Sequence, residues 1–322
     1  MRKNFALWIL ICFAIFGCGA LSAAFGLSAN LDLPPSRPEI MARDFGNGMI
    51  RTIESIPFQA PETGALMKAL LTGDRSSLSP TVTEAFRASG ASHILALSGL
   101  HLGIIYMILS KTMAIFGNGI YARRVRSCML VIFCGFYTLA TGAGSSIVRG
   151  FLFILLSEIA RLSGRYRSLT QILHASLLLQ LIFSPLSALS VGFQLSYAAM
   201  AGIAFIFPWL KGLWPEDDSA SSPMTACGRK IVNMAKWIWT SAALSISCQL
   251  TTGPLVYIYF GSLPKYFLLT NLLALPLTGI LIPSAVLTIF LSAIGCCPEL
   301  VTQATESLAN LLIWILSVIS TL

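Results

Sequence analysis

Long apolar runs separated by short polar stretches fill most of this chain and constrain its fold more than any other feature. After a first run at 5–27, they cover about 91–116, 128–143, 147–162, 169–183, 191–210, 238–260, 266–294 and 304–322. About 20 apolar residues in a helix cross the hydrocarbon core of a bilayer. The sequence therefore predicts an all-α, polytopic integral membrane bundle of about eight to ten membrane segments, with broken or re-entrant helices among them.

The charged residues support a membrane protein. They make up 11% of the chain, whereas a soluble domain has about 25%. Arg2 and Lys3 precede the run at 5–27, which is longer than the core of about 7–15 residues in a signal peptide. We expect residues 1–27 to be an uncleaved membrane anchor, 28–90 an extracytoplasmic segment with short amphipathic helices, and 91–322 the main transmembrane domain.

The formal net charge of +8 follows the loops between the apolar runs. The basic clusters at 123–126, 161–167 and 211–236 fall on the same side of the membrane as Arg2 and Lys3 when the predicted segments alternate. Cytoplasmic loops are enriched in Lys and Arg. We predict a multi-pass membrane protein with its N-terminus in the cytoplasm, and the charge alone does not require nucleic acid.

Motifs for catalysis or metal binding are not evident in the sequence. The eight cysteines form no CxxC pair and have no neighbouring histidine cluster, so we predict neither disulfides nor a metal site. GxSxG, HExxH and phosphate-loop patterns are also absent from the sequence. We expect no catalytic residues and no cofactor.

The segment from Ala91 to Gly103 combines polar and small residues. If it is one helix, each residue turns by about 100°. His93, Ser98 and His101 then share one side, and Ala96, Gly99 and Gly103 lie roughly opposite. Small residues allow close helix packing, and a polar stripe in a membrane faces a cavity or a polar partner. The alternative is that both histidines are structural residues of the bundle.

A second cluster runs from Thr141 to Gly150 and contains three glycines, two serines and Arg149. It predicts a broken helix or re-entrant turn, which membranes tolerate where the backbone is buried or lines water. Arg149 can meet an anion there or reach the membrane interface. Gln194 and Ser196 can line a path or bond helices together. Glu158 and Arg161 form an i,i+3 pair.

Prolines interrupt the last apolar runs. Pro254, Pro276 and Pro283 are expected to break or kink their helices. Such helices occur in transporters and channels as well as in inert bundles.

Several of these blocks together resemble the ComEC-type competence proteins. They are 73–75, 85–103, 148–150, 184–185, 192–197, Pro254 and 259–261, in the family's order. The resemblance implies a channel in the bacterial cytoplasmic (inner) membrane that passes single-stranded DNA into the cytoplasm during natural transformation. It marks His93, Ser98, His101 and Arg149 as candidate path-lining or signature positions, and it implies that Gly99, Gly103, Gly192, Phe193 and Ser196 shape the bundle. On residue type and spacing alone, Gln194 and Ser196 are further path-lining candidates and Ala96 is a further helix-packing position.

The resemblance also implies partners and exposes departures from the family. A cytoplasmic helicase-like motor and an extracytoplasmic DNA receptor are the expected partners besides DNA and lipid, and the oligomeric state stays open. Family members often carry an OB-like outer domain and a metallo-β-lactamase-like domain. This sequence matches neither, so we expect a channel rather than a nuclease.

Two other functions remain open from the residues. A small-molecule or ion transporter would use the same broken helices and polar stripe. An intramembrane hydrolase would use Ser98 with a histidine, but His101 lies close on the same predicted helix and His174 near the opposite membrane face. Dependence of DNA uptake on the gene would distinguish the channel from the transporter.

Overall fold

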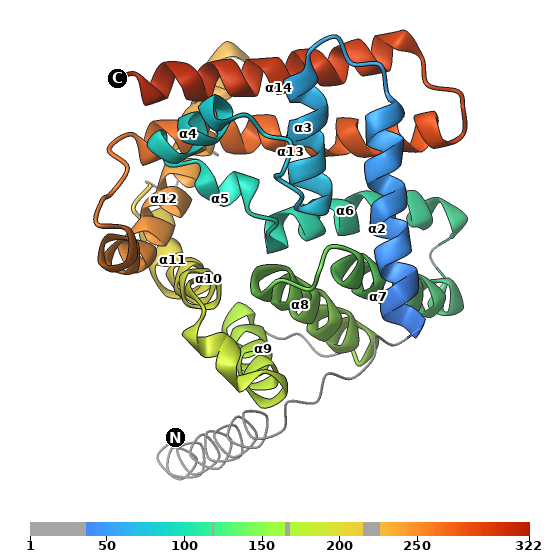
Figure 1. The fold of residues 1–322 in the computed structure, drawn as a ribbon. Coiled ribbons are helices and arrows are strands. Elements are labelled where there is room, and N and C mark those ends of the chain that lie inside the picture. The colour runs from blue at the N-terminus through green and yellow to red at the C-terminus, as the bar shows by residue number, and fades with distance from the viewer. Residues whose placement is uncertain (1–36, 118, 165–167, 215–225) are drawn as a thin grey trace. The chain divides into compact units, whose positions relative to one another are not determined.

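The computed structural model describes residues 37–117, 119–164, 168–214 and 226–322. Regular structure in these ranges is helical throughout (Figure 1), which confirms the all-α prediction. The predicted anchor at 1–27, with Arg2 and Lys3, lies outside the described residues, as do Arg165 and Arg167.

Helices cover most of the described chain, including parts of the polar stretch before residue 91. In chain order they are α2 (Arg37–Ser55), α3 (Pro61–Thr72), α4 (Pro80–Ala88), α5 (Ser92–Leu95), α6 (Gly99–Met113), η1 (Ala114–Phe116), α7 (Ile120–Ala140), α8 (Ser145–Leu162), α9 (Leu169–Phe183), η2 (Pro185–Leu189), α10 (Val191–Ala201), the π-helical turn η3 (Gly202–Ile206), α11 (Phe207–Gly212), α12 (Ala226–Phe260), α13 (Phe267–Ala293) and α14 (Glu299–Ser320).

Three helical stretches among the described residues are long and apolar enough to cross a membrane. They are Val191–Gly212, which joins α10, η3 and α11, then α13, and then α14. The helices α6 and α9 are also apolar but have 15 residues each. The chain is therefore an integral membrane protein, and the larger number of eight to ten segments stays a prediction.

The prolines of the last runs do not break their helices. Pro254 lies inside α12, and Pro276 and Pro283 lie inside α13, which continues from Phe267 to Ala293. The structure excludes a break at these positions, and the kink that the sequence also allows stays a prediction. A proline removes one backbone donor from the hydrogen-bond ladder, and in a membrane bundle neighbouring helices and hydroxyl side chains can compensate for that loss.

The described chain forms two compact units. Unit 1 combines residues up to Asn47 with Ser98–Gln194, and unit 2 combines Gly48–Leu97 with Leu195–Leu322. In unit 1, α8 packs against α6, α7 and α9. In unit 2, α14 packs along α13 and against α3 and α4.

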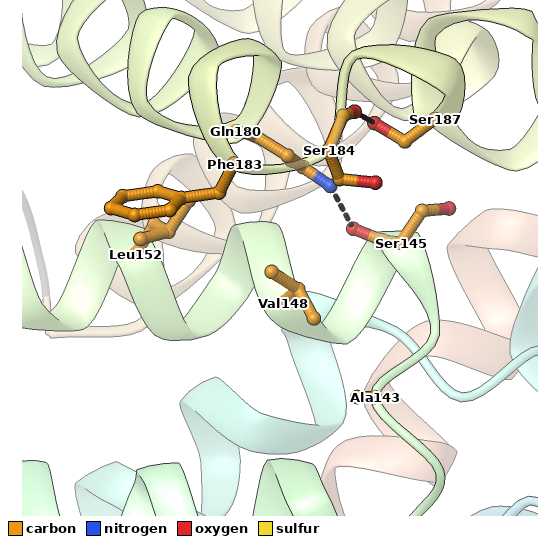
Figure 2. A pocket seen from close by; sticks show the side chains of 8 residues that line it. All are labelled: Ala143, Ser145, Val148, Leu152, Gln180, Phe183, Ser184 and Ser187. Atoms are coloured by element: carbon orange, nitrogen blue, oxygen red, sulfur yellow. Dashed lines mark hydrogen bonds between the residues drawn. The ribbon is translucent and has the colours of Figure 1, made fainter. Parts of the chain in front are cut away.

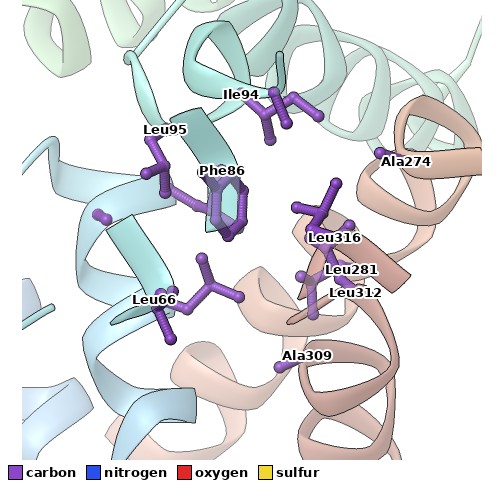
Figure 3. Close-up of a cluster of buried hydrophobic side chains, with 13 residues drawn as sticks. Leu66, Phe86, Ile94, Leu95, Ala274, Leu281, Ala309, Leu312 and Leu316 are labelled. Carbon is purple, nitrogen blue, oxygen red and sulfur yellow. The ribbon is translucent and has the colours of Figure 1, made fainter. Parts of the chain in front are cut away.

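Unit 2 has a core that joins distant parts of the sequence (Figure 3). Leu66 on α3, Phe86 on α4 and Ile94 on α5 share one buried cluster with Leu281 on α13 and Leu312 on α14. Leu66 and Phe86 lie in residues 28–90, which we expected to form a separate extracytoplasmic segment. Leu281 and Leu312 lie in the last two apolar runs. Residues of α3 and α4 thus share one core with α13 and α14 in unit 2, and the domain bounds predicted at 27/28 and 90/91 stay predictions.

Polar contacts reinforce this packing within unit 2. Glu306 on α14 accepts hydrogen bonds from the backbone N–H groups of Ala60 at 2.5 Å and Gln59 at 3.3 Å, just before α3 begins. The Thr270 hydroxyl on α13 donates to the Ser89 carbonyl at 2.8 Å. The α3 and α4 ends are therefore fixed to α13 and α14 by specific bonds as well as by apolar contact.

Candidate functional site at the first turns of α6 and α8

The segment around His93, Ser98 and His101 is not one helix. The short helix α5 ends at Leu95, Ala96 takes an extended conformation with ψ 118°, and α6 begins at Gly99. The angular spacing that placed the two histidines on one stripe therefore does not apply across the break. The predicted continuous polar stripe was wrong, because Ser98 starts a new helix.

Ser98 and His101 form a capping box at the start of α6. The His101 Nδ1 atom accepts the Ser98 backbone N–H at 3.2 Å and lies 2.9 Å from the Ser98 Oγ atom. The Ser98 Oγ atom also accepts the Leu100 N–H at 3.3 Å. Such a box satisfies donors that a helix start leaves without partners. His101 is fully buried, so the pair holds the first turn of α6 in place.

The chain breaks again between α7 and α8, where the sequence predicted it. Gly142 has φ +82° and Ala143 has φ +50°, a left-handed conformation that is uncommon outside glycine. The next helix, α8, starts at Ser145 after Gly144. Arg149 lies one turn into α8 and is 7% exposed. The predicted turn before Arg149 is confirmed, and its place in the membrane stays a prediction.

Two glycines bring α6 and α8 into direct backbone contact in unit 1. A Cβ atom added to Gly150 would lie 2.7 Å from the Gly99 Cα atom, and one added to Gly99 would lie 3.3 Å from the Gly150 Cα atom. Gly99 thus lies at the contact between the two helices. A Cβ atom on Gly103 would meet nothing within 4 Å, so the structure shows no such contact for Gly103, and its packing role stays a prediction.

Three helices, α8, α9 and α10, meet around Ser145. The Gln180 Nε2 atom on α9 donates to the Ser145 carbonyl at 3.3 Å (Figure 2). A Cβ atom on Gly192, at the start of α10, would lie 3.2 Å from the Ser145 Oγ atom. Beside these contacts is a pocket of about 230 Å³. Its lining residues are Ala143, Ser145, Val148, Leu152, Gln180, Phe183, Ser184 and Ser187.

One protein family model matches the whole of the region that contains α6 to α10. A model described as "Competence protein" matches residues 70–322. The chain belongs to the competence protein family. It is 34% identical to ComE operon protein 3 of Bacillus subtilis over 142 residues, which cover 43% of this chain and 17% of that protein. It is 24% identical to Recombination protein 2 of Haemophilus influenzae over 259 residues, which cover 77% of this chain and 31% of that protein.

A third relative is Competence protein ComA of Neisseria gonorrhoeae, 31% identical over 144 residues that cover 43% of this chain and 20% of the relative. The alignments thus span less than a third of each relative named here. No solved structure is significantly similar to this chain.

The remaining candidates of this competence protein lie in different surroundings. His93 is exposed on α5, with its Nδ1 atom 3.1 Å from the Gly90 carbonyl. On α10, Gln194 donates to the Ala188 carbonyl at 3.0 Å, Phe193 is buried, and Ser196 is partly buried. The structure therefore groups Ser98, His101, Gly99 and Arg149 with the start of α8, and it leaves His93 on a separate short helix.

A buried ionic cluster links three helices of unit 1. The Glu158 carboxylate on α8 accepts a bond from Arg161 at 2.5 Å, as the i,i+3 spacing predicted, and a second bond from the Tyr106 hydroxyl on α6. Arg161 also donates to the Ser127 hydroxyl on α7 at 3.1 Å. This cluster neutralises the buried acidic group and ties α6, α7 and α8 together.

Sequence reasoning missed three residues of these contacts. Gln180 and Tyr106 each lie in an apolar run without a local polar partner, so their bonds to Ser145 and Glu158 depend on the packing of distant helices. Glu306 is a single acidic residue near the start of the last apolar run. An acidic or amide side chain inside an apolar run is the signal that could have identified Gln180 and Glu306 as bonded groups.

Proposed function

We propose that this protein forms an inner-membrane channel for single-stranded DNA during natural transformation. The observation that carries the proposal is the competence family match over residues 70–322. Members of this family are linked to DNA uptake in transformation, and one of the relatives is named as a competence protein. The alignments span only part of each relative. For that reason, transport of the DNA strand by this chain is part of what we propose.

The first turns of α6 and α8 are the best candidates for the working part of the channel. In this proposal Arg149 supplies the cation that phosphate groups meet, because backbone phosphates dominate the affinity of proteins for nucleic acid. Ser98 and His101 position the start of α6, and Gly99 and Gly150 hold α6 against α8. Gln194 and Ser196 contribute polar groups along α10, and His93 acts from α5.

We also propose where the chain lies in the membrane and which partners it has. The N-terminus lies in the cytoplasm, in accord with the basic loops. A cytoplasmic motor would pull the strand, and an extracytoplasmic receptor would deliver it.

Deleting the gene and measuring transformation frequency tests the channel. Complementation with wild type should restore transformation, and Arg149→Ala should reduce it strongly while Arg149→Lys retains part of it. Arg51→Ala, at an exposed arginine of unit 2, is the matched control. The amount of each variant in the membrane is measured beside it. Normal transformation in the deletion strain would refute the proposal and favour solute transport.

Two substitutions of His101 separate positioning from direct contact with DNA. Glutamine can accept the N-cap N–H in a capping box, whereas alanine cannot. If His101 positions α6, His101→Gln should retain transformation and His101→Ala should lose it. If both variants accumulate normally and both fail, the imidazole itself is required in the path.

A further inference from the structure

The positive charge of this chain is concentrated in one part of unit 1. Between Ser98 and Gln194 the sequence has one acidic residue, Glu158. The basic residues of the same stretch are Lys111, Arg123, Arg124, Arg126, Arg149, Arg161, Arg165 and Arg167. Since the Glu158 carboxylate is buried and bonded to Arg161, it does not neutralise the cations at the surface.

Arginines lie at one end of α7, on both sides of an exposed apolar stripe. At about 100° for each residue, Tyr121, Val125, Met129 and Ile132 fall within about 40° of one line along the helix. All four side chains are more than half exposed, Tyr121 by 82% and Ile132 by 70%. Arg124 and Arg126 lie about 100° to either side of this line.

The opposite side of α7 belongs to the interior of unit 1. Ser127, Leu130, Cys134 and Tyr137 are buried there, and Arg161 bonds to Ser127. The stripe is therefore not the face that packs in unit 1. Other exposed side chains of both kinds lie nearby in the chain, namely Lys111 and Ile115 before α7, and Ile120 and Arg123 in its first turn.

We propose that the start of α7, from Ile120 to Met129, together with Lys111, binds the headgroups of anionic phospholipids. The apolar stripe would lie along acyl chains, and the guanidinium groups on both sides would reach the phosphates at the interface. Arginine suits this role because its planar group binds phosphate with two parallel hydrogen bonds. The surface binds lipid whether or not the protein carries DNA.

Lipid fits this surface better than a nucleic acid strand. A single strand binds to basic grooves lined by aromatic side chains on which its bases stack. The stripe on α7 is mainly aliphatic, with Tyr121 as its aromatic member. Valine, methionine and isoleucine gain more from contact with acyl chains than from contact with a phosphate backbone.

Retention of lipid by the purified full chain tests the surface. The protein is exchanged into neutral detergent with either phosphatidylglycerol or phosphatidylcholine, and bound lipid is counted by native mass spectrometry. Wild type should retain phosphatidylglycerol preferentially. The triple variant Arg123→Gln, Arg124→Gln and Arg126→Gln should lose apparent affinity by about fivefold for each charge removed. Lys265→Gln, at an exposed lysine of unit 2, should leave it unchanged.

A triple Arg→Lys variant at the same positions is the control for a loss of folding. It keeps the charge and should retain most of the preference for phosphatidylglycerol. Equal loss in the lysine and glutamine variants would overturn an electrostatic lipid surface, as would equal retention of the two lipids by wild type. A single-stranded oligonucleotide is the second probe. If the glutamine variant loses only the oligonucleotide, the surface belongs to nucleic acid and the lipid proposal fails.

Discussion

Gly99 and Gly103 lie about one helical turn apart on α6, but their surroundings should give opposite responses to an added methyl group. A methyl group on Gly99 or Gly150 meets the backbone of the facing helix, whereas one on Gly103 meets open space. Overpacking costs about 1–3 kcal/mol, and alanine is favoured over glycine inside a helix by about 1 kcal/mol. Gly99→Ala and Gly150→Ala should lower the Tm in detergent, and Gly103→Ala should leave it unchanged or raise it. Similar Tm values for Gly99→Ala and Gly103→Ala would contradict the contact.

Glu158 and Arg161 should respond unequally when either is replaced. Glu158 is almost fully buried, but Arg161 is 43% exposed and can turn toward polar surroundings. Arg161→Met leaves a buried carboxylate without its cation, a change that costs about 3 kcal/mol or more in a fully buried pair. Glu158→Gln should cost less, because it removes the buried charge itself.

The double variant provides the control for this pair. Adding Glu158→Gln to Arg161→Met should recover part of the lost thermal stability, measured by tryptophan fluorescence during heating in detergent. A double variant as unstable as the sum of both single variants would show that the two side chains do not interact.

At the scale of the helix, Glu306 should stabilise the first turn of α3. Its carboxylate accepts the N–H groups of Gln59 and Ala60 immediately before that helix, and hydrogen bonds to a charged group contribute about 1.5–3 kcal/mol. Glu306→Ala should therefore speed hydrogen exchange in peptides from residues 57–72. Peptides from α9 in unit 1 serve as the internal reference, and unchanged exchange near α3 would exclude this role.

The sequence predicted the helices better than their contacts. Apolar runs such as 169–183 and 266–294 coincide with α9 and α13 within one residue, because lipid requires continuous apolar helices of sufficient length. The stripe from His93 to His101 failed for a local reason. Ser98 can act as a helix cap as well as an interior residue, and apolar periodicity does not distinguish the two.

The candidate site was predictable only in part for a similar reason. The turn before α8 and the packing role of Gly99 could be inferred from glycine and serine spacing alone. The partner of Gly99, which is Gly150, and the bond from Gln180 to Ser145 depend on how separate helices cross. No local pattern in a single sequence specifies such crossings, since many helix pairs carry small residues.

For the whole chain, the folded core extends beyond the region that the competence family model covers. The match begins at residue 70, but Leu66 and Ala69 are already part of the buried cluster of unit 2. That cluster contains Leu312 and Leu316 near the other end of the chain. Residues just before the family domain are thus required for the packing of its last helix.

Leu66→Ala should accordingly destabilise all of unit 2 rather than α3 alone. Removing a fully buried leucine side chain costs about 2–5 kcal/mol, and Leu66 packs in one cluster with residues of α4, α13 and α14. Hydrogen exchange should increase in α14 as well as in α3. Met41→Ala, at an exposed methionine of α2, should change neither. Faster exchange confined to α3 would mean that α3 can separate while α13 and α14 remain folded, which would make residues 48–90 an independent segment after all.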